Sequence, residues 1–330
     1  MLDIILLTHT PEMRRNYYPE EALAGLRALG RVRLHEEPQP LDGQGLIAAA
    51  QGMRVIVADR MTPGPAEVFR ALPELTAFVR VAVDIRNIDV DAASAAGVLV
   101  TRAGPGFIDS VTELTLGFLV DLSRGISRAT SEYQAGHFPE PRMGRQLSGS
   151  TLGIIGYGTI ARRLAPLAVA IGMTVLVSDP YATVEDQALR QTSLDEVLAI
   201  SDYVVCLAVA TAGTENLMGD SAFAKMKDGA FFVNVSRGNL VDETALEGAI
   251  RAGRLGGVAL DVGRAPDQMP SPHIAALPGV VATPHVGGLT PAASAAQALD
   301  TVRQVGAILQ NTVPPGAVNA EHWTRRIVPA

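Results

Sequence analysis

The chain has 330 residues, 48% apolar and 18% charged, so it can bury a substantial core and is expected to form two globular domains. Its net charge of −7 and pI near 5.4 argue against a nucleic-acid-binding face. The single cysteine, Cys206, excludes an internal disulfide. No apolar run reaches membrane-spanning length, and the N-terminus is typical of a strand rather than a signal peptide, so we expect a cytoplasmic protein without membrane contact.

Short apolar runs alternate with longer helical patterns along the chain. This alternation predicts an α/β protein whose parallel sheets are covered by helices. The expected strands are residues 2–8, 54–58, 77–82, 98–101, 152–156, 174–178, 203–207, 231–235, 256–260 and 280–283.

Several helix signals are local. Ser193 stands at an N-cap position, and Asp242 can cap a helix that Gly253 ends. Residues 108–135 carry apolar side chains at helical spacing and predict one long helix or two abutting ones. A loose stretch at 136–141 and a glycine-rich boundary near 287–291 suggest a discontinuous layout. We expect one domain from residues 1–103 and 290–330, and another from residues 104–289.

A nucleotide-binding turn follows the strand at 152–156. Gly156 permits a tight turn, Gly158 lets the backbone approach a pyrophosphate, and Ala161 stands where a third glycine is usual. The next helix would point its N-terminus at the phosphates. The predicted cofactor contacts here are Gly156, Tyr157, Gly158, Thr159 and Ile160.

The following strand ends in Asp179, 23 residues after Gly156. A carboxylate at this place suits the hydroxyls of an adenosine ribose and repels a 2′-phosphate, so NAD is favoured over NADP. The alternative is an aspartate that only caps the turn before Pro180. Turn, helix and acid together favour the dinucleotide site.

Three polar residues, Arg237, Asp261 and His285, lie 24 positions apart, each at the end of an apolar run. Ligand sites in open α/β sheets gather at the carboxyl ends of strands. A guanidinium such as Arg237 can hold a carboxylate, and a histidine such as His285 can exchange a proton near neutral pH. A surface arginine and a structural histidine are the alternatives. No second His or Cys stands at ligand spacing from His285, so we predict no metal.

Four motifs, read in order, resemble the D-isomer-specific 2-hydroxyacid dehydrogenase family, and the resemblance covers nearly the whole chain. They are residues 153–158, 234–242, 257–262 and 283–288. The resemblance implies two doubly wound parallel-sheet domains, with a Rossmann coenzyme domain inserted into a flavodoxin-like substrate domain. It also implies NAD as cofactor, a small 2-oxo or 2-hydroxy acid as substrate, and a homodimer in which the helix through 114–126 is an interface element.

The resemblance further assigns roles. Arg237 would bind and polarise the 2-oxo acid, His285 would be the acid/base, Asp261 would contact the nicotinamide carboxamide, and Asp179 would hold the ribose. Further implied contacts are Val235, Ser236, His285 and Gly287 for the cofactor, and Arg60, Val81, Ala82 and Arg237 for the substrate.

The chain departs from the family pattern in two places. In the family pattern, a glutamate five residues after the position of Asp261 pairs with the catalytic histidine and orients its ring. This chain has Pro266 at that place, and we hypothesise that the carboxylate of the adjacent Asp267 takes over as a catalytic residue. The substrate loop at 80–89 lacks the family's glycine. Its Arg86, like Arg102 beyond it, either pairs with acids such as Asp84 or recognises a second acidic group, as in a dicarboxylate or phosphorylated substrate.

The leading prediction is an NAD-dependent oxidoreductase that interconverts a 2-oxo acid and a D-2-hydroxy acid. The alternative from another class is a non-catalytic NAD-binding scaffold or regulator of the corepressor type. The missing glutamate favours the scaffold, whereas the retained Arg237 and His285 argue against it. Oxidation of an unusual small anion such as formate or phosphite would use the same scaffold, and nothing in the sequence specifically supports it.

Overall fold

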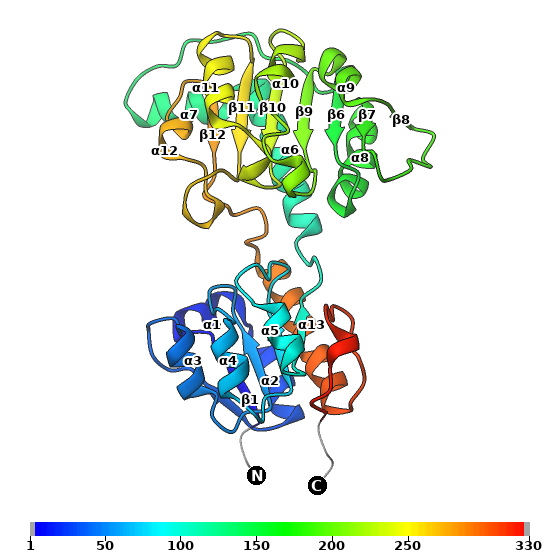
Figure 1. Ribbon diagram of the computed structural model, residues 1–330. Helices are drawn as coiled ribbons and strands as arrows, with labels where there is room; N and C mark the ends of the chain where they lie inside the picture. Colours follow the sequence, from blue (N-terminus) through cyan, green and yellow to red (C-terminus); the bar gives the residue numbers. More distant parts are fainter. Residues whose placement is uncertain (1–3, 327–330) are drawn as a thin grey trace. The chain divides into compact units, whose positions relative to one another are not determined.

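The computed structural model describes residues 4–326. Residues 2 and 3 of the first predicted strand, and residues 327–330 of the predicted C-terminal segment, lie outside the described residues. The chain divides into two compact units, Met1–Phe107 with Thr290–Ala330 (unit 1) and Ile108–Leu289 (unit 2) (Figure 1). The predicted limits were 103/104 and 289/290.

Unit 1 contains a five-stranded sheet of order β2-β1-β3-β4-β5, in which all neighbours are parallel. This is the strand order of flavodoxin-like doubly wound folds. Its strands are β1 (Ile5–Leu7), β2 (Val32–Leu34), β3 (Val55–Ala58), β4 (Ala77–Arg80) and β5 (Leu99–Arg102).

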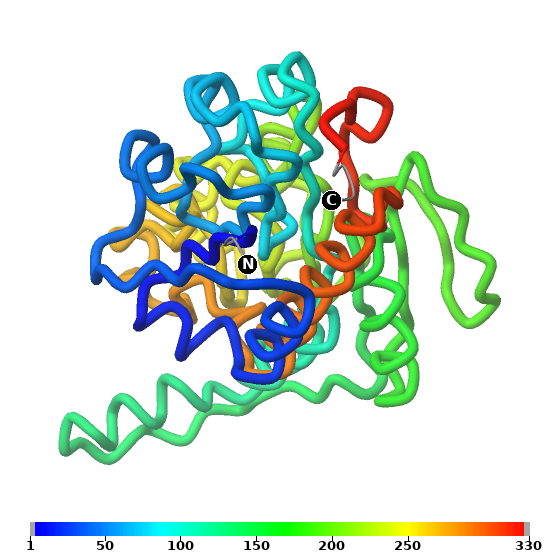
Figure 2. Tube along the Cα trace, turned by 90° about the horizontal axis from the view of Figure 1, so that it is seen from below, coloured from blue at the N-terminus to red at the C-terminus, as the bar shows by residue number. Residues whose placement is uncertain are grey.

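Helices cover both faces of this sheet, which explains why its central strands are apolar on both sides. One core lies between the sheet and α2 and α13, and the other between the sheet and α3, α4 and α5. Figure 2 shows α13, from the far end of the chain, running beside α2. The helices are α1 (Pro11–Tyr17), α2 (Glu20–Leu29), α3 (Gly43–Ala49), α4 (Ala66–Ala71), α5 (Val90–Ala95) and α13 (Pro291–Leu309).

Unit 2 contains a seven-stranded parallel sheet of order β12-β11-β10-β9-β6-β7-β8. The order reverses between β6 and β9, which is the switch point where Rossmann folds bind dinucleotides. The strands are β6 (Thr151–Ile155), β7 (Thr174–Ser178), β8 (Leu189–Gln191), β9 (Tyr203–Cys206), β10 (Phe231–Asn234), β11 (Gly257–Leu260) and β12 (Val280–Ala282).

A core of apolar side chains joins this sheet to α9, α10, α11 and α12. Helices α6 and α8 pack against each other, and α6 also contacts β10 and β11. The helices of unit 2 are α6 (Ile108–Arg124), α7 (Ile126–Gln134), α8 (Thr159–Ile171), α9 (Leu194–Ile200), α10 (Asp220–Lys225), α11 (Glu243–Arg251) and α12 (Pro272–Ala275). Within residues 4–326, none of the helices combines the length and apolar character needed to cross a bilayer.

The predicted α/β fold with two parallel sheets is confirmed. Each predicted strand corresponds to an observed one, but β2 and β8 were missed. Both are three-residue strands at the edges of their sheets, and their polar residues, such as Arg33 and Arg190, hide the apolar signal. The segment 108–135 is two abutting helices, α6 and α7. They break at Gly125, whose φ of 66° suits a residue without a Cβ.

The predicted caps are present. The side chain of Ser193 accepts a hydrogen bond from Glu196 N at the start of α9. The carboxylate of Asp242 accepts from Thr244 N and Ala245 N at the start of α11. Each cap satisfies helix N–H groups that would otherwise lack a partner.

Candidate active site

Three neighbouring strands of unit 2 end level with one another. In the register of β10, β11 and β12, Asn234 pairs with Leu260, and Leu260 pairs with Ala282. Residue 261 follows the end of β11 directly, and residues 237 and 285 come three positions after the ends of β10 and β12. The parallel register therefore gathers the sequence-predicted Arg237, Asp261 and His285 at the carboxyl edge of the sheet.

The buried side chain of Asn234 holds the turn that carries Arg237. Asn234 Nδ2 donates to Arg237 O at 3.0 Å, and Asn234 Oδ1 accepts from Ser236 N at 3.1 Å. Ser236 Oγ donates to Ala208 O at 2.7 Å. Arg237 is half-buried, and its Nη1 donates to Ser236 O at 2.7 Å. Asn234 was not singled out from the sequence, although a polar residue ending a buried strand is a usable signal.

Asp261 is 2% exposed and holds the next turn in place. Its Oδ1 accepts from Thr283 Oγ1 at 2.6 Å and from Val286 N at 2.8 Å, and its Oδ2 accepts from Gly287 N at 2.8 Å. A carboxylate offers about four acceptor positions, so most are used inside the protein. Besides the expected nicotinamide contact, Asp261 fixes the residues on both sides of His285.

The ring of His285 has a defined main-chain partner. Its Nδ1 lies 2.6 Å from Asp267 O, and the ring is half-buried. A carbonyl oxygen can only accept, so Nδ1 carries the proton and Nε2 is the acceptor in the neutral ring. The sequence hypothesis gave Asp267 a partner role through its carboxylate. The contact seen between the two residues uses the peptide carbonyl.

The loop that presents this carbonyl contains the 3₁₀ turn Pro266–Gln268. Asp267 and Gln268 have φ of 58° and 60°, two consecutive left-handed residues. Gly263 N donates to Gln268 O at 2.8 Å, and Gly238 N donates to Gln268 Oε1 at 3.3 Å. The loop is thus bonded to the turn that carries Arg237, a link that sequence spacing could not predict.

The predicted nucleotide turn follows β6, at the switch point of the sheet. Gly156 has φ of 92°, and a Cβ there would lie 2.7 Å from the main chain of Ala208. A Cβ on Gly158 would meet nothing within 4 Å, so the N-terminus of α8 is open to a phosphate group. Tyr157 is buried, whereas Thr159 is exposed and Ile160 half-buried at the start of α8. The residues present fit a bound NAD.

Asp179 reaches back to this turn. Its Oδ2 accepts from Tyr157 N at 2.7 Å, and its Oδ1 accepts from Tyr181 N at 2.8 Å and Ala182 N at 2.9 Å. Partial burial acts to raise the pKa of Asp179, but these three N–H groups and Arg162 outweigh it and hold the pKa below its usual range. The carboxylate is therefore charged, and an acceptor position is left for a ribose hydroxyl.

The predicted substrate-side residues belong to unit 1. Arg60 follows β3 and is exposed, whereas Val81 and Ala82 follow β4 and are buried. Val81 N donates to Ala58 O at 2.9 Å. Of the extra cations, Arg86 pairs with Asp84, with 3.0 Å between Nε and Oδ1 and 2.6 Å between Nη2 and Oδ2.

Arg80 is a buried cation that the sequence did not single out. Its Nη2 donates to Thr62 O at 2.8 Å and to Asn87 Oδ1 at 2.7 Å, and its Nη1 donates to Asp59 O. Asn87 Nδ2 in turn donates to Arg60 O at 3.2 Å. These bonds tie the loop after β3, which carries Arg60, to the loop after β4.

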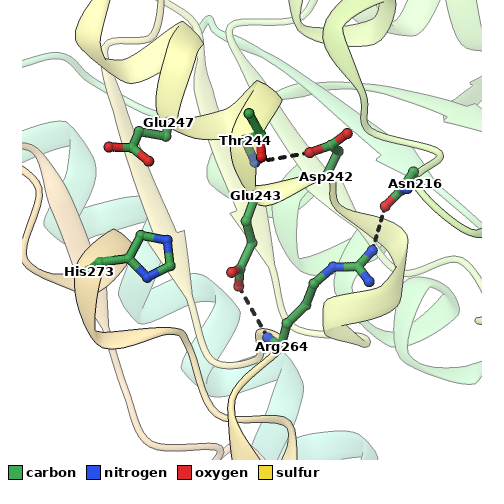
Figure 3. A pocket seen from close by; sticks show the side chains of 7 residues that line it. All are labelled: Asn216, Asp242, Glu243, Thr244, Glu247, Arg264 and His273. Atoms are coloured by element: carbon green, nitrogen blue, oxygen red, sulfur yellow. Dashed lines mark hydrogen bonds between the residues drawn. The ribbon is translucent and has the colours of Figure 1, made fainter.

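An open polar cavity of about 430 Å³ lies beside the start of α11 (Figure 3). None of the predicted site residues lines it. Within residues 4–326, no group of three or more His, Cys, Asp and Glu side chains is placed to hold a metal ion. The cavity lining consists of Asn216, Asp242, Glu243, Thr244, Glu247, Arg264 and His273.

Comparison with known proteins agrees with this geometry. The model of the D-isomer specific 2-hydroxyacid dehydrogenase NAD-binding domain matches residues 116–287. An (S)-sulfolactate dehydrogenase from Chromohalobacter salexigens is 34% identical over 254 residues, covering 76% of this chain and 82% of that protein. A D-3-phosphoglycerate dehydrogenase from Mycobacterium leprae is 34% identical over 284 residues, which cover 85% of this chain and 54% of that protein. The chain therefore spans about half the length of that relative.

Among solved structures, D-2-hydroxyisocaproate dehydrogenase superposes with a TM-score of 0.86 at 21% identity, covering 96% of this chain and 100% of that one. At that identity the match concerns the fold. Common descent is shown by the family-model match and by the 34% identity to the sulfolactate dehydrogenase. The chain belongs to the D-isomer specific 2-hydroxyacid dehydrogenase family, whose members are NAD-dependent oxidoreductases of 2-hydroxy and 2-oxo acids.

Proposed function

We propose that this chain interconverts a 2-oxo acid and a D-2-hydroxy acid, with Arg237 binding the substrate and His285 exchanging the proton. The observation that carries the proposal is the level ending of β10, β11 and β12, which gathers both residues at one sheet edge. Unit 2 would bind NAD and unit 1 would supply the substrate loops.

The residues of the chain divide the work as follows. NAD, when bound, supplies or accepts the hydride at the C2 carbon of the acid. Arg237 pairs with the carboxylate and carbonyl oxygen and stabilises the negative charge that develops on that oxygen. The protonated His285 donates the proton on Nε2 to this oxygen, while its Nδ1–H group stays hydrogen-bonded to Asp267 O. In the oxidative direction, neutral Nε2 accepts the hydroxyl proton.

The carboxylate of Asp179 supports NAD over NADP. Three backbone N–H groups fix it beside the nucleotide turn and keep it charged. A second negative charge from a 2′-phosphate would meet it directly, whereas a ribose hydroxyl can donate to it.

We further propose a substrate with a second anionic group. Two similar proteins are named for sulfolactate and phosphoglycerate, each a hydroxy acid with an additional anion. Arg86 is engaged by Asp84, whereas Arg102 is exposed at the end of β5. Arg102 is the better candidate. Arg102→Ala is expected to raise KM for diacids about tenfold or more and leave monoacids unchanged, since a charge-assisted bond contributes about 1.5–3 kcal/mol. Equal effects on both classes would refute this.

A homodimer is proposed as well. Helix α7 has no buried residue, and several apolar side chains near the end of α6, on α7 and in the segment after it are exposed. Exposed apolar groups concentrated in one segment favour burial against a partner. Sedimentation of the wild type and of a Phe138→Glu, Met143→Glu variant would test it, with a smaller species expected for the variant. The exposed side chains are Val120, Ile126, Tyr133, Phe138 and Met143. The cytoplasmic location stays a prediction from the sequence.

The experiment for the main proposal is NADH oxidation with a panel of acids, including glyoxylate, hydroxypyruvate, pyruvate, phenylpyruvate and oxaloacetate. Arg237→Ala is expected to raise KM strongly for any acid that turns over, because the carboxylate loses its partner. Tight NADH binding without turnover of any acid would favour the non-catalytic scaffold, for which the absent glutamate at Pro266 is the specific observation.

A further inference from the structure

We propose that the main-chain carbonyl of Asp267 sets the proton position on His285, and that Glu243 is a positioning residue which clamps the loop presenting this carbonyl. The inference rests on the proposed acid/base role of His285. It replaces the carboxylate partner expected from the family pattern with a peptide group held by a distant side chain.

The Nδ1 nitrogen of His285 already has a hydrogen-bond partner. A ring nitrogen has a single N–H, and at 2.6 Å from Asp267 O that N–H is engaged. The carbonyl has no proton to donate, so the neutral ring has its lone pair on Nε2 as long as this bond is made. A peptide dipole thus orients this ring where a charged carboxylate does so in the family pattern.

The direction of the carbonyl depends on the two consecutive left-handed residues, Asp267 and Gln268, a conformation that non-glycine residues rarely adopt and that the surroundings must hold. Three hydrogen bonds hold this loop: Gly263 N to Gln268 O, Ala265 N to Met269 O, and Gly238 N to Gln268 Oε1.

A side chain from α11 clamps the loop as well. Glu243, the first residue of α11, accepts from Arg264 N at 3.1 Å through Oε1. It also accepts from Ser271 Oγ, 2.9 Å from Oε1 and 2.7 Å from Oε2. One carboxylate thereby bonds to both ends of the 264–271 loop. Figure 3 shows the carboxylate of Glu243 pointing at the backbone nitrogen of Arg264.

Arg264 ties this clamp to the rest of unit 2. Its Nε donates to Val241 O at 3.0 Å, its Nη2 to Asn239 O at 3.1 Å, and its Nη1 lies 2.9 Å from Glu215 Oε1. Glu243 and Arg264, two residues that line the cavity, therefore anchor the loop.

Glu247 offers a matched control. It lies one turn further along α11 and lines the same cavity, but its Oε1 accepts from Arg251 Nε at 2.8 Å on its own helix. Its removal changes the charge of the cavity by the same amount as removal of Glu243 and leaves the clamp in place.

The test is nuclear magnetic resonance of ¹⁵N-histidine-labelled full-length protein, with His285→Gln to assign the His285 signals. We expect the wild type, Glu247→Ala and Asp267→Asn to show one tautomer, with the proton on Nδ1. We expect Glu243→Ala to show a mixture of tautomers and a kcat reduced about tenfold or more, with KM for NADH unchanged. Ser271→Ala, which removes one of the two clamp contacts, should show the same changes at smaller size and decides the matter if Glu243→Ala fails to fold.

Two results would overturn the inference. One is a change of tautomer in Asp267→Asn, or an inflection of its pH–rate profile displaced by about one unit or more, because either would assign the partner role to the carboxylate. The other is a Glu243→Ala spectrum identical to that of Glu247→Ala. The spectra need no turnover, so failure of the inference is distinguishable from failure of the proposed function, which would show as turnover retained without His285.

Discussion

Acidification should destabilise unit 1 through one buried histidine. His9 is 2% exposed, its ring centroid lies 5.1 Å from that of Tyr18, and within residues 4–326 its Nδ1 has no hydrogen-bond partner. Burial lowers the pKa of His9 to about 4, and it outweighs the attraction of Asp59, while Arg14 and Arg80 lower it further. His9→Phe keeps a ring of similar size and removes the titration.

The sign follows from proton binding. Because the pKa of His9 is about 4 in the folded state and near its ordinary value of 6.5 in the unfolded chain, the unfolded chain binds more protons between these values. The contribution of His9 to the free energy of unfolding is fully present above pH 6.5 and is lost as the pH falls toward about 4. The total is about 3 kcal/mol, of which about 2 kcal/mol falls between about pH 8 and about pH 5.

The assay is urea unfolding followed by tryptophan fluorescence at these two pH values. Trp323 is the single tryptophan, is buried, and packs in a core of unit 1, so it reports on that unit. Wild type should lose about 2 kcal/mol more than His9→Phe on acidification, since all other titrating groups are shared. The same loss in both proteins would refute the reasoning.

Three further predictions test separate features. Burial raises the pKa of Cys206 to about 12, so a thiol reagent should react with it only after unfolding, and fast reaction of the native protein would contradict its burial. Gly156→Ala should lower Tm by about 5 °C or more because its Cβ meets Ala208, whereas Gly158→Ala should keep Tm and weaken NADH binding; calorimetry and NADH fluorescence distinguish them. Asp179→Ala should raise KM for NADH about tenfold and reduce the preference for NADH over NADPH. An unchanged ratio of kcat/KM for the two cofactors would argue against a contact between Asp179 and the ribose.

The sequence was sufficient for most of the fold because parallel strands buried on both faces are continuous apolar runs. Val55–Ala58 and Tyr203–Cys206 are examples in which each residue is buried. Strands β2 and β8 could not be recognised in the sequence, because an edge strand buries less apolar surface than a central one and tolerates polar residues. Which strands neighbour one another is also beyond local pattern, since order depends on how the helices cross over the sheet.

In the candidate site, the strand-end positions of Arg237, Asp261 and His285 were predictable from the sequence, and the hydrogen-bond partners of these residues were not. Arg237 and His285 stand out by chemistry and strand-end position. The partner of His285 could not be recognised in the sequence, because it is a peptide carbonyl whose direction depends on the left-handed conformation of Asp267 and Gln268. Asp261 was expected at the cofactor, and its three bonds to the His285 turn follow only from the pairing of β11 with β12.

The most direct test of the account is the rate of NADH oxidation by His285→Gln beside wild type, at saturating NADH and with the best acid of the panel. The account predicts that kcat falls by about 10²–10⁴-fold, the contribution of a positioned acid/base, while the variant still binds NADH. Turnover by His285→Gln at the wild-type rate would contradict it, because the proton would then come from another group.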